Sequence, residues 1–342
     1  MSGIRKFRNV IRDPHPKKNI LRILYEVFYW FFIYREFPKF YFGHRIYHND
    51  VINFKDFLSK RESLYLLSLN GKYGKNNLKV YCDNKLLFDR IMNEANLKVP
   101  ELIGYKISSR LYFTLRSQQV HIENTSNLIE ALQSILQEYS EVFIKPINAY
   151  GGKNCFLLTN ENFDQISQRL FSSGDFLVQR RLEQHEAIQK IYPHSINTVR
   201  FDSHTDEKGN TTILSALIRL GANKSVVDNA SSGGFFVNVD LESGRLAEKG
   251  VQFLAHGHNV FYEHPDTNTK LNNYLIPNFE DAKALVIKAT EVLPLIVAGW
   301  DVAITVDGPV IIEVNDRPMM TMSDTANGGY KKNETLRKLL KM

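Results

Sequence analysis

The feature that most constrains the fold is a stretch near the C-terminus with the sequence GWDVAITVDGPVIIEVNDRP, residues 299–318. On both sides of an Asp-Gly-Pro turn the even positions are apolar, whereas the odd positions carry the acids and an amide. This alternation predicts a β-hairpin with one apolar and one polar face. Because residues opposite each other in a hairpin share a face, the pattern requires a loop with an odd number of residues.

A three-residue loop over 307–309 satisfies this requirement and places Asp301 opposite Asn315. A two-residue loop would set each apolar residue against a polar one. The predicted register gathers Asp301, Glu313 and Asn315 into one patch of oxygen atoms, the ligand type that Mg²⁺ prefers. The alternative interpretation is a sheet with one solvated face, on which acids are ordinary.

A second stretch combines a lysine with two glycines. The predicted strand over 141–147 holds Lys145 among apolar residues, and the sequence NAYGGKN follows it before the next strand. A buried lysine is costly unless an anion pairs with it. A glycine loop between strands exposes backbone N–H groups that can close over phosphates. Without the lysine these glycines would indicate an ordinary turn, because the loop matches neither a Walker motif nor a GxGxxG turn.

The N-terminal segment is basic and then aromatic. Residues 5–22 hold seven lysines and arginines and one acid, and the apolar run over 23–34 is interrupted by Glu26 and is too short to span a bilayer. This composition favours a helix that lies in the headgroup region of an anionic membrane. The alternative is a helix packed on the protein's own core, with the lysines solvated. The bases belong to no recognised nucleic-acid module, so we expect no nucleic-acid partner.

Two helices are expected beside these stretches. Asp83 would cap a helix over 84–96, with Lys85 in its first turn. A helix over 280–297 would be broken or kinked at Pro294.

Two arginines and a polar loop are further candidates. Arg200 and Arg219 lie near the ends of predicted strands, and the alternative for Arg200 is a surface side chain whose stem covers apolar area. The loop VDNASSGG would either bind a polar substrate or form a wide turn. Its candidate residues are Asp228, Asn229, Ser231, Ser232, Gly233 and Gly234.

Four segments in this order resemble the motif set of ATP-grasp enzymes: DNKLLFDRI, FIKPINAYGGKN, FLVQRRLEQHE and WDVAITVDGPVIIEVN. The segments SINTVRF, RLG, VDNASSGG and GWD are most similar to the sugar-transfer-associated ATP-grasp family, which is found with polysaccharide biosynthesis. The resemblance covers about residues 40–330. No single motif is decisive, and the order and spacing of the set make it specific.

The resemblance implies a role for each matching residue. The lysines that contact the phosphates and the adenine edge of ATP would be Lys85 and Lys145. The flap over the phosphates would comprise Tyr150, Gly151, Gly152 and Lys153. The adenine hinge would comprise Gln179, Arg180, Arg181 and Leu182, and the ribose acid would be Glu186 or its neighbour Glu183. The ligands of Mg²⁺, with two ions expected, would be Asp301, Glu313 and Asn315.

The sequence departs from the family pattern at two places. Some amino-acid-ligating members carry an arginine where this chain has Gly299, so Arg200 or Arg219 would stabilise the acyl phosphate instead. The N-terminal part is short, basic and aromatic, where many members have a full α/β domain. The residues expected to act on the reacting phosphate are Arg200, Arg219 and Lys153. The expected substrate site comprises Arg219, Asp228, Asn229, Ser232, Gly233, Gly234 and Arg317.

The resemblance implies an α+β, ATP-grasp fold in which two subdomains clamp ATP between antiparallel sheets, with a helical N-terminal extension. We expect four regions: a basic and aromatic one (1–60), an α/β part (61–140), a small subdomain with flap and hinge (141–187) and a large subdomain with the metal site (188–342).

The implied activity is ATP-dependent ligation of a carboxylate to an amine through an acyl phosphate, which requires positioning and charge neutralisation rather than a nucleophilic side chain. The implied substrates are a uronic acid, free or glycan-, nucleotide- or lipid-linked, and an amino acid or amine of a cell-surface polysaccharide. A kinase of a sugar hydroxyl and a non-catalytic, membrane-associated nucleotide-binding protein are the alternatives. Two cysteines without a disulfide framework indicate a cytoplasmic protein, and the N-terminal segment indicates the inner membrane face.

Overall fold

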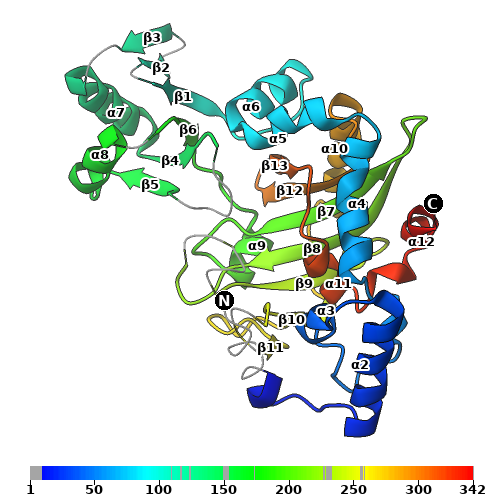
Figure 1. The fold of residues 1–342 in the computed structure, drawn as a ribbon. Coiled ribbons are helices and arrows are strands. Elements are labelled where there is room, and N and C mark those ends of the chain that lie inside the picture. The colour runs from blue at the N-terminus through cyan, green and yellow to red at the C-terminus, as the bar shows by residue number, and fades with distance from the viewer. Residues whose placement is uncertain are drawn as a thin grey trace.

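The computed structural model describes residues 10–341, except 109, 116–117, 123–124, 149–153, 173, 226–227, 229–232, 255–256 and 258. Two antiparallel sheets with covering helices make up most of this part of the chain (Figure 1). A group of helices from the N-terminal residues packs at the edge of the larger half (Figure 1). The prediction of an α+β fold with two antiparallel sheets and a helical N-terminal extension is confirmed.

The smaller sheet has six strands in the order β3-β2-β1-β6-β4-β5. Its strands are β1 (Leu102–Ile107), β2 (Arg110–Leu115), β3 (Gln118–Ile122), β4 (Glu141–Pro146), β5 (Phe156–Thr159) and β6 (Phe176–Arg180). Its apolar core is shared with two amphipathic helices, α7 (Thr125–Tyr139) and α8 (Phe163–Ser172). Because β1 pairs with β6, the predicted boundary between residues 140 and 141 falls inside this sheet.

The larger sheet has seven strands in the order β11-β10-β9-β8-β7-β12-β13. Its strands are β7 (Thr198–Thr205), β8 (Thr211–Leu220), β9 (Phe235–Val239), β10 (Leu246–Val251), β11 (Val260–Phe261), β12 (Val297–Thr305) and β13 (Gly308–Asn315). Helix α10 (Phe279–Val292) packs on this sheet. The expected continuation of α10 to residue 297 is wrong: the helix ends before Pro294, which lacks an N–H donor, and β12 begins at Val297.

The loop of the β12–β13 hairpin is shorter than predicted. Thr305 pairs with Gly308, so the loop consists of residues 306–307 and not of 307–309. Every residue of β12 is buried, which means that both faces of the sheet are covered next to this loop. The prediction assumed one polar face along the whole hairpin, and that assumption holds only at the end far from the loop.

A β-bulge separates the two parts of the hairpin. Beyond it, Asp301 pairs with Glu313, and Asn315 pairs with Gly299 rather than with Asp301, as predicted. The bulge adds one residue, Ile312, to β13. The residues of β13 beyond the bulge therefore point to the opposite face from the one that unbroken pairing would give them. The three predicted metal ligands therefore lie on one face of the hairpin, in a register that the sequence pattern did not predict.

Two short helices lead into the smaller sheet. Helix α5 (Lys79–Asp83) ends at Asp83, and α6 (Lys85–Glu94) is capped by Asn84, whose side chain accepts the amides of Leu86 and Leu87. The prediction that Asp83 is the cap is wrong, because Asn84 takes the extended backbone of an N-cap. The amide of Lys85 donates to the carbonyl of Ile147 at 3.1 Å. This bond joins the start of α6 to the end of β4.

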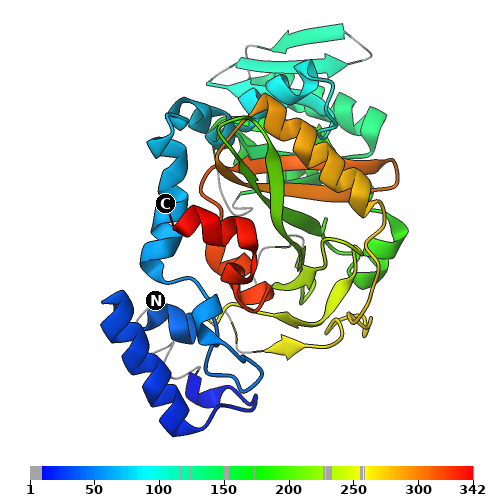
Figure 2. The same ribbon diagram turned by 90° about the vertical axis from the view of Figure 1, so that its right-hand side faces the viewer.

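The remaining helices surround the larger sheet. They are α4 (Lys60–Lys72), α9 (Glu186–Ile191), α11 (Met320–Ala326) and α12 (Glu334–Leu340). The N-terminal module, residues 10–57, contains α2 (Ile20–Tyr34) and α3 (Lys39–Gly43) and has an apolar cluster of its own around Trp30, Tyr41 and Tyr47. Figure 2 shows α2 along the outer edge of the molecule. Within the residues described, no helix is both long enough and apolar enough to cross a membrane.

Candidate active site

Asp301 is the centre of a buried ion cluster on the larger sheet. It is fully buried and lies opposite Arg200 in the β12–β7 ladder. Arg200 donates through Nε to Oδ1 at 2.5 Å and through Nη2 to Oδ2 at 3.0 Å. Burial alone would raise the pKa of Asp301, but Arg200 and Arg219 lower that pKa to about 2. Asp301 is therefore an anion that holds an arginine in a fixed orientation.

Arg219 extends this cluster towards the polar loop that follows β8. Its Nη2 lies 3.1 Å from Asp301 Oδ2, and its Nε lies 3.3 Å from Asp228 Oδ2. Asp228 also accepts from the hydroxyl of Thr198 at 2.5 Å and from the amide of Thr198 at 3.0 Å. Two arginines and two carboxylates thus form one network, with a threonine hydroxyl between them.

Glu313 and Asn315 continue the same face on β13. The carboxyl groups of Glu313 and Asp301 share a hydrogen bond, and burial and the Asp301 charge raise the pKa of Glu313. Lys85 Nζ lies 4.0 Å from Glu313 Oε2. Asn315 Nδ2 is buried and has no hydrogen-bond partner among the residues that the structure describes.

Lys145 faces this cluster from the smaller sheet. Its side chain is buried in β4, and burial lowers its pKa to about 8, a change that Glu313 opposes and Lys85 reinforces. Because Lys145 belongs to β4 and Glu313 to β13, the charged groups come from both sheets. The predicted lysines and the predicted metal ligands are therefore neighbours, although more than 150 residues separate Lys145 from Asp301 in the chain.

The residues of this face fit a divalent cation in their donor chemistry. Two adjacent carboxylates, Asp301 and Glu313, repel each other when both are ionised, and a cation between them would relieve that repulsion. Asn315 adds an amide oxygen on the same face. In the described part of the chain, no group of three or more His, Cys, Asp or Glu side chains is arranged to hold a metal ion. From the described residues, a metal site on this face would consist of two carboxylates and an amide, with Asp301 also bound to the arginines.

Gly299 explains how Arg200 reaches its place. A Cβ on Gly299 would lie 2.8 Å from Pro318 Cβ and 3.1 Å from Arg200 Nη1. The guanidinium of Arg200, which comes from the neighbouring strand β7, therefore occupies the space that a side chain at position 299 would need. The arginine beside Asp301 therefore comes from β7, whereas an arginine at position 299 would come from β12.

The sequence matches the sugar-transfer associated ATP-grasp family over residues 66–339. The chain belongs to this family. The predicted resemblance and the assignment to the ATP-grasp enzymes are confirmed at the level of the family. No curated protein sequence matches the chain.

Three solved structures with a similar fold are distant in sequence. D-alanyl-alanine synthetase A from Vibrio cholerae has 13% identity and a TM-score of 0.46, with 77% of this chain and 65% of that chain covered. The ADP complex of purK, N5-carboxyaminoimidazole ribonucleotide synthetase, has 14% identity and a TM-score of 0.42, with 70% and 46% covered. The ATP-grasp ligase PsnB, complexed with a minimal precursor, has 13% identity and a TM-score of 0.42, with 78% and 63% covered. The ATP-grasp chain thus spans less than two thirds of the length of each.

The predicted adenine hinge lies at the end of β6. The Gln179 side chain is buried, and the amide of Arg180 donates to the carbonyl of Glu101 at 2.9 Å. That bond uses the Arg180 N–H in the sheet, so pairing with adenine would fall to the backbone of Arg181 and Leu182. The side chains of Arg180 and Arg181 lie outside the ion cluster, where they pair with Glu101 and Glu141.

The other predicted ATP-grasp residues are less closely connected to the cluster. Glu183 and Glu186 are exposed, and Glu186 is the first residue of α9. Gly233 accepts from the side chain of Gln252 at 2.6 Å, Gly234 is buried and Arg317 is exposed. The predicted residues that lie outside the described part of the chain are Tyr150, Gly151, Gly152, Lys153, Asn229, Ser231 and Ser232.

Two residues next to the lysines were not among the predicted ones. Asp89 is buried in α6, its Oδ2 has no partner among the described residues, and its charge opposes the lowering of the Lys145 pKa. Its sequence signal is the spacing of four residues from Lys85, which places both on one side of a helix. Cys155 interacts with the charges of Lys145, Lys85 and Glu313. Neither its position nor its neighbours in the sequence indicate this.

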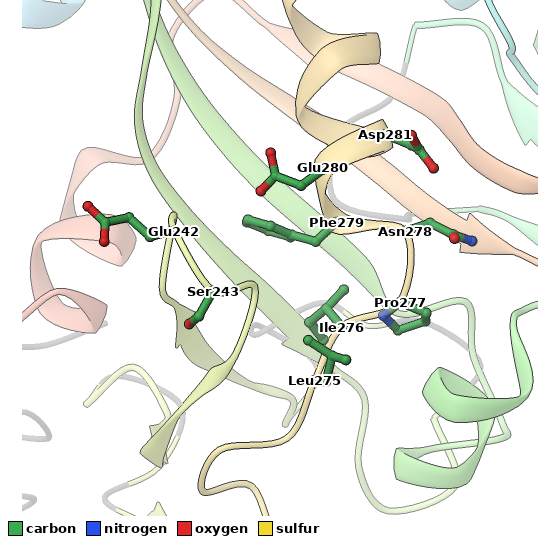
Figure 3. Close-up of a pocket in the computed structure, with 9 residues that line it drawn as sticks. All are labelled: Glu242, Ser243, Leu275, Ile276, Pro277, Asn278, Phe279, Glu280 and Asp281. Atoms are coloured by element: carbon green, nitrogen blue, oxygen red, sulfur yellow. The ribbon is translucent and has the colours of Figure 1, made fainter.

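Two cavities differ in their position relative to the ion cluster. A cavity of about 610 Å³ is lined by Asn84 and Asn148, which adjoin Lys85 and the end of β4. A second one, of about 290 Å³, lies between the β9–β10 turn and the start of α10 (Figure 3). The acids that line it are Glu242, Glu280 and Asp281, and it contains no predicted site residue. Because its acids would repel phosphate groups, we do not assign it to the active site.

Proposed function

We propose that the chain is an ATP-dependent carboxylate–amine ligase that acts through an acyl phosphate. The observation that carries this proposal is the ion cluster in which Lys85 of α6 and Lys145 of β4 lie near Glu313 of β13. Cations on one side and carboxylates on the other are what a nucleoside triphosphate with its metal ion requires. Family membership supports the same reaction class.

The roles of the residues follow from their contacts. Lys85 and Lys145 would bind phosphate oxygens, since Lys145 is a buried cation without a hydrogen bond or ion pair to any described residue. Glu313, Asn315 and Asp301 would hold Mg²⁺, as one ion or two, and bound Mg²⁺ neutralises the charge of the phosphates. With that ion bound, Asp301, Glu313 and Asn315 would orient the γ-phosphate for attack by the incoming carboxylate.

Arg200 and Arg219 would stabilise the acyl phosphate. Arg200 uses Nε and Nη2 on Asp301, and its Nη1 lies beside Gly299. Arg219 bridges Asp301 and Asp228 and so connects the reacting group to the polar loop. Arginines held by carboxylates need little reorganisation when charge develops on the substrate.

The finer substrate proposal rests on the family and on the polar loop. A sugar-transfer associated family supports a uronic acid or its glycan-linked form as the carboxylate, and an amine or amino acid as the acceptor, in cell-surface polysaccharide synthesis. Asp228, Gly233, Gly234 and Arg317 would contribute to that site, together with the loop residues Asn229 and Ser232. We place the reaction in the cytoplasm, where Cys82 and Cys155 would remain reduced thiols.

The test is ADP release with a panel of uronic acids in the presence of hydroxylamine. We expect ADP and a hydroxamate in equal amounts, because hydroxylamine intercepts an acyl phosphate. A stable phosphorylated sugar without a hydroxamate would replace the ligase by a sugar kinase. No turnover with any acid, despite saturable ATP binding, would replace it by a nucleotide-binding protein without catalysis.

A further inference from the structure

The inner face of α2 packs on the N-terminal module, where its buried charge is fully paired. Asn19 caps the helix by accepting the amide of Leu21, and Glu26 and Trp30 are its only buried residues. Glu26 accepts from Lys18 at 2.8 Å, from Arg22 at 3.0 Å and from the hydroxyl of Tyr41 at 2.8 Å. This face accounts for the attachment of α2 to the N-terminal module, and it leaves most of the helix surface unexplained.

The outer face of α2 is almost entirely apolar. The large apolar side chains exposed on it, each by 45% or more, are Ile20, Leu21, Leu24, Tyr25, Phe28, Phe31, Phe32 and Ile33. At about 100° per residue, the first seven fall within an arc of roughly 140°, and neither charged residue of the helix, Arg22 or Glu26, lies inside it. The described residues therefore leave a continuous apolar stripe uncovered along the whole helix.

The size of this stripe exceeds that of an ordinary surface patch. The aromatic side chains of Tyr25, Phe28, Phe31 and Phe32 are exposed by 59, 57, 50 and 66%. At about 200 Å² for a whole aromatic side chain, these four alone expose on the order of 450 Å². With the aliphatic residues, the stripe is larger than the several hundred Å² at which patches mark interaction sites.

Basic side chains precede and follow the helix in the sequence, and one more lies beside it. Lys17 and Lys39 are exposed before and after the helix, and Arg35 follows its last residue. Lys55 Nζ lies 4.8 Å from the centre of the Tyr29 ring, which places another cation beside the helix. Two copies of this face in contact would bring like charges together, whereas an anionic lipid surface would attract them. The charge pattern therefore favours lipid headgroups over a second copy of this chain.

The N-terminal module is joined firmly to the catalytic half. The amide of Leu58, directly after the module, donates to Asp324 at 3.0 Å, and Arg45 donates to the carbonyl of Gln252 at 3.0 Å. Lys331 donates to the hydroxyl of Tyr34 at 3.1 Å, which ties the end of α2 itself to the C-terminal region. A surface that holds α2 would consequently hold the larger sheet in one orientation.

We propose that the outer face of α2 inserts into the headgroup region of an anionic bilayer and positions the catalytic sheets over the membrane surface. The aromatic and aliphatic side chains would be buried at the interface, and the surrounding lysines and arginines would contact anionic headgroups. A helix of 15 residues would lie in the plane of the membrane rather than cross it.

The experiment is co-sedimentation of the full chain with vesicles of phosphatidylcholine, alone or mixed with phosphatidylglycerol. We expect binding to the mixed vesicles that salt weakens severalfold without abolishing it, because salt screens charges but not apolar burial. The double variant Phe28→Ser/Phe32→Ser should bind at least about tenfold more weakly. The variant Lys39→Gln should bind the mixed vesicles about fivefold more weakly.

The matched control is Tyr262→Ser/Leu275→Ser, which removes two side chains that are 53 and 50% exposed far from α2 in the sequence. We expect it to bind like the unchanged chain. The proposal is overturned if the unchanged chain ignores mixed vesicles, or if the control loses as much binding as the α2 variant. It is also overturned if the chain sediments as a dimer that Phe28→Ser/Phe32→Ser converts to a monomer. None of these outcomes depends on ATP turnover.

Discussion

Lys18 and Lys145 are buried to nearly the same extent, at 6 and 5% exposed, and their surroundings differ. Lys18 Nζ donates to both carboxylate oxygens of Glu26, at 3.0 and 2.8 Å. Lys145 Nζ has no hydrogen bond or ion pair with any described residue, and its pKa falls to about 8 through burial. Burial also lowers the pKa of Lys18, but the Glu26 contact opposes that change.

We interpret Lys18 as a structural charge and Lys145 as a charge that binds a ligand. The Lys18 cluster satisfies its own charges inside the N-terminal module, so its effect is on stability. The cluster at Lys145 combines a cation without a hydrogen bond, a carboxylate whose pKa is raised and an amide donor without a partner. Groups left in this condition cost stability in the free protein, and an anion with its metal ion would satisfy them.

The largest effect we expect from this comparison is on turnover. Lys145→Ala and Glu313→Ala should each lower ATP turnover about a thousandfold or more, because each removes charge stabilisation of the transferred phosphate. Lys18→Ala should leave the turnover of the folded protein unchanged. Steady-state ADP release, normalised to the folded fraction, measures this. Turnover close to that of the unchanged chain in well-folded Lys145→Ala would end the nucleotide assignment.

The next effect concerns stability at Lys18. Lys18→Met should lower the free energy of unfolding by about 3 kcal/mol, because Glu26 stays buried with one cation fewer. Arg22 and Tyr41 still contact Glu26, which keeps the loss at the lower end of the range for a broken buried pair. Urea unfolding measures it. An unchanged unfolding midpoint would mean that the ion pair between Lys18 and Glu26 does not stabilise the fold.

Lys145→Met, unlike Lys18→Met, should raise the free energy of unfolding of the protein without nucleotide. A pKa lowered from 10.5 to about 8 means that the folded state disfavours the lysine charge. The cost, at most about 3 kcal/mol, is fully present below pH 8 and disappears as pH rises from about 8 to 10.5. The methionine variant should therefore be more stable at pH 7, with an advantage that shrinks over that window. Equal stability at pH 7 would contradict the comparison.

The smallest effect concerns the space that Arg200 occupies. Gly299→Ala should lower the free energy of unfolding by about 1–2 kcal/mol and reduce turnover severalfold, because the new Cβ would meet Arg200 and Pro318. Gly174→Ala is the control, since a Cβ there meets nothing within 4 Å. If both alanine variants keep full turnover, Arg200 does not act from its position beside Gly299.

The sequence predicted the parts of the ion cluster better than the contacts within it. Lys145 stood out because a lysine in an apolar strand needs an anion, and that reasoning is local. The pairing of Asp301 with Arg200 could not be predicted, because it depends on which strand lies beside β12 in the sheet. Asp89 was missed for the same reason: only the packing of α6 against β4 brings it to Lys145.

By itself, the sequence determined that residues 299–318 form a hairpin and that Glu313 and Asn315 share one face of its second strand, because side chains alternate along any strand. It also determined the family, through the order of its motifs. Only the tertiary structure decided the register, since burial of both faces near the loop allows a two-residue loop and a bulge then restores the shared face. It also decided that α2 keeps an apolar face towards solvent, because the N-terminal module fills its small core with one side of that helix.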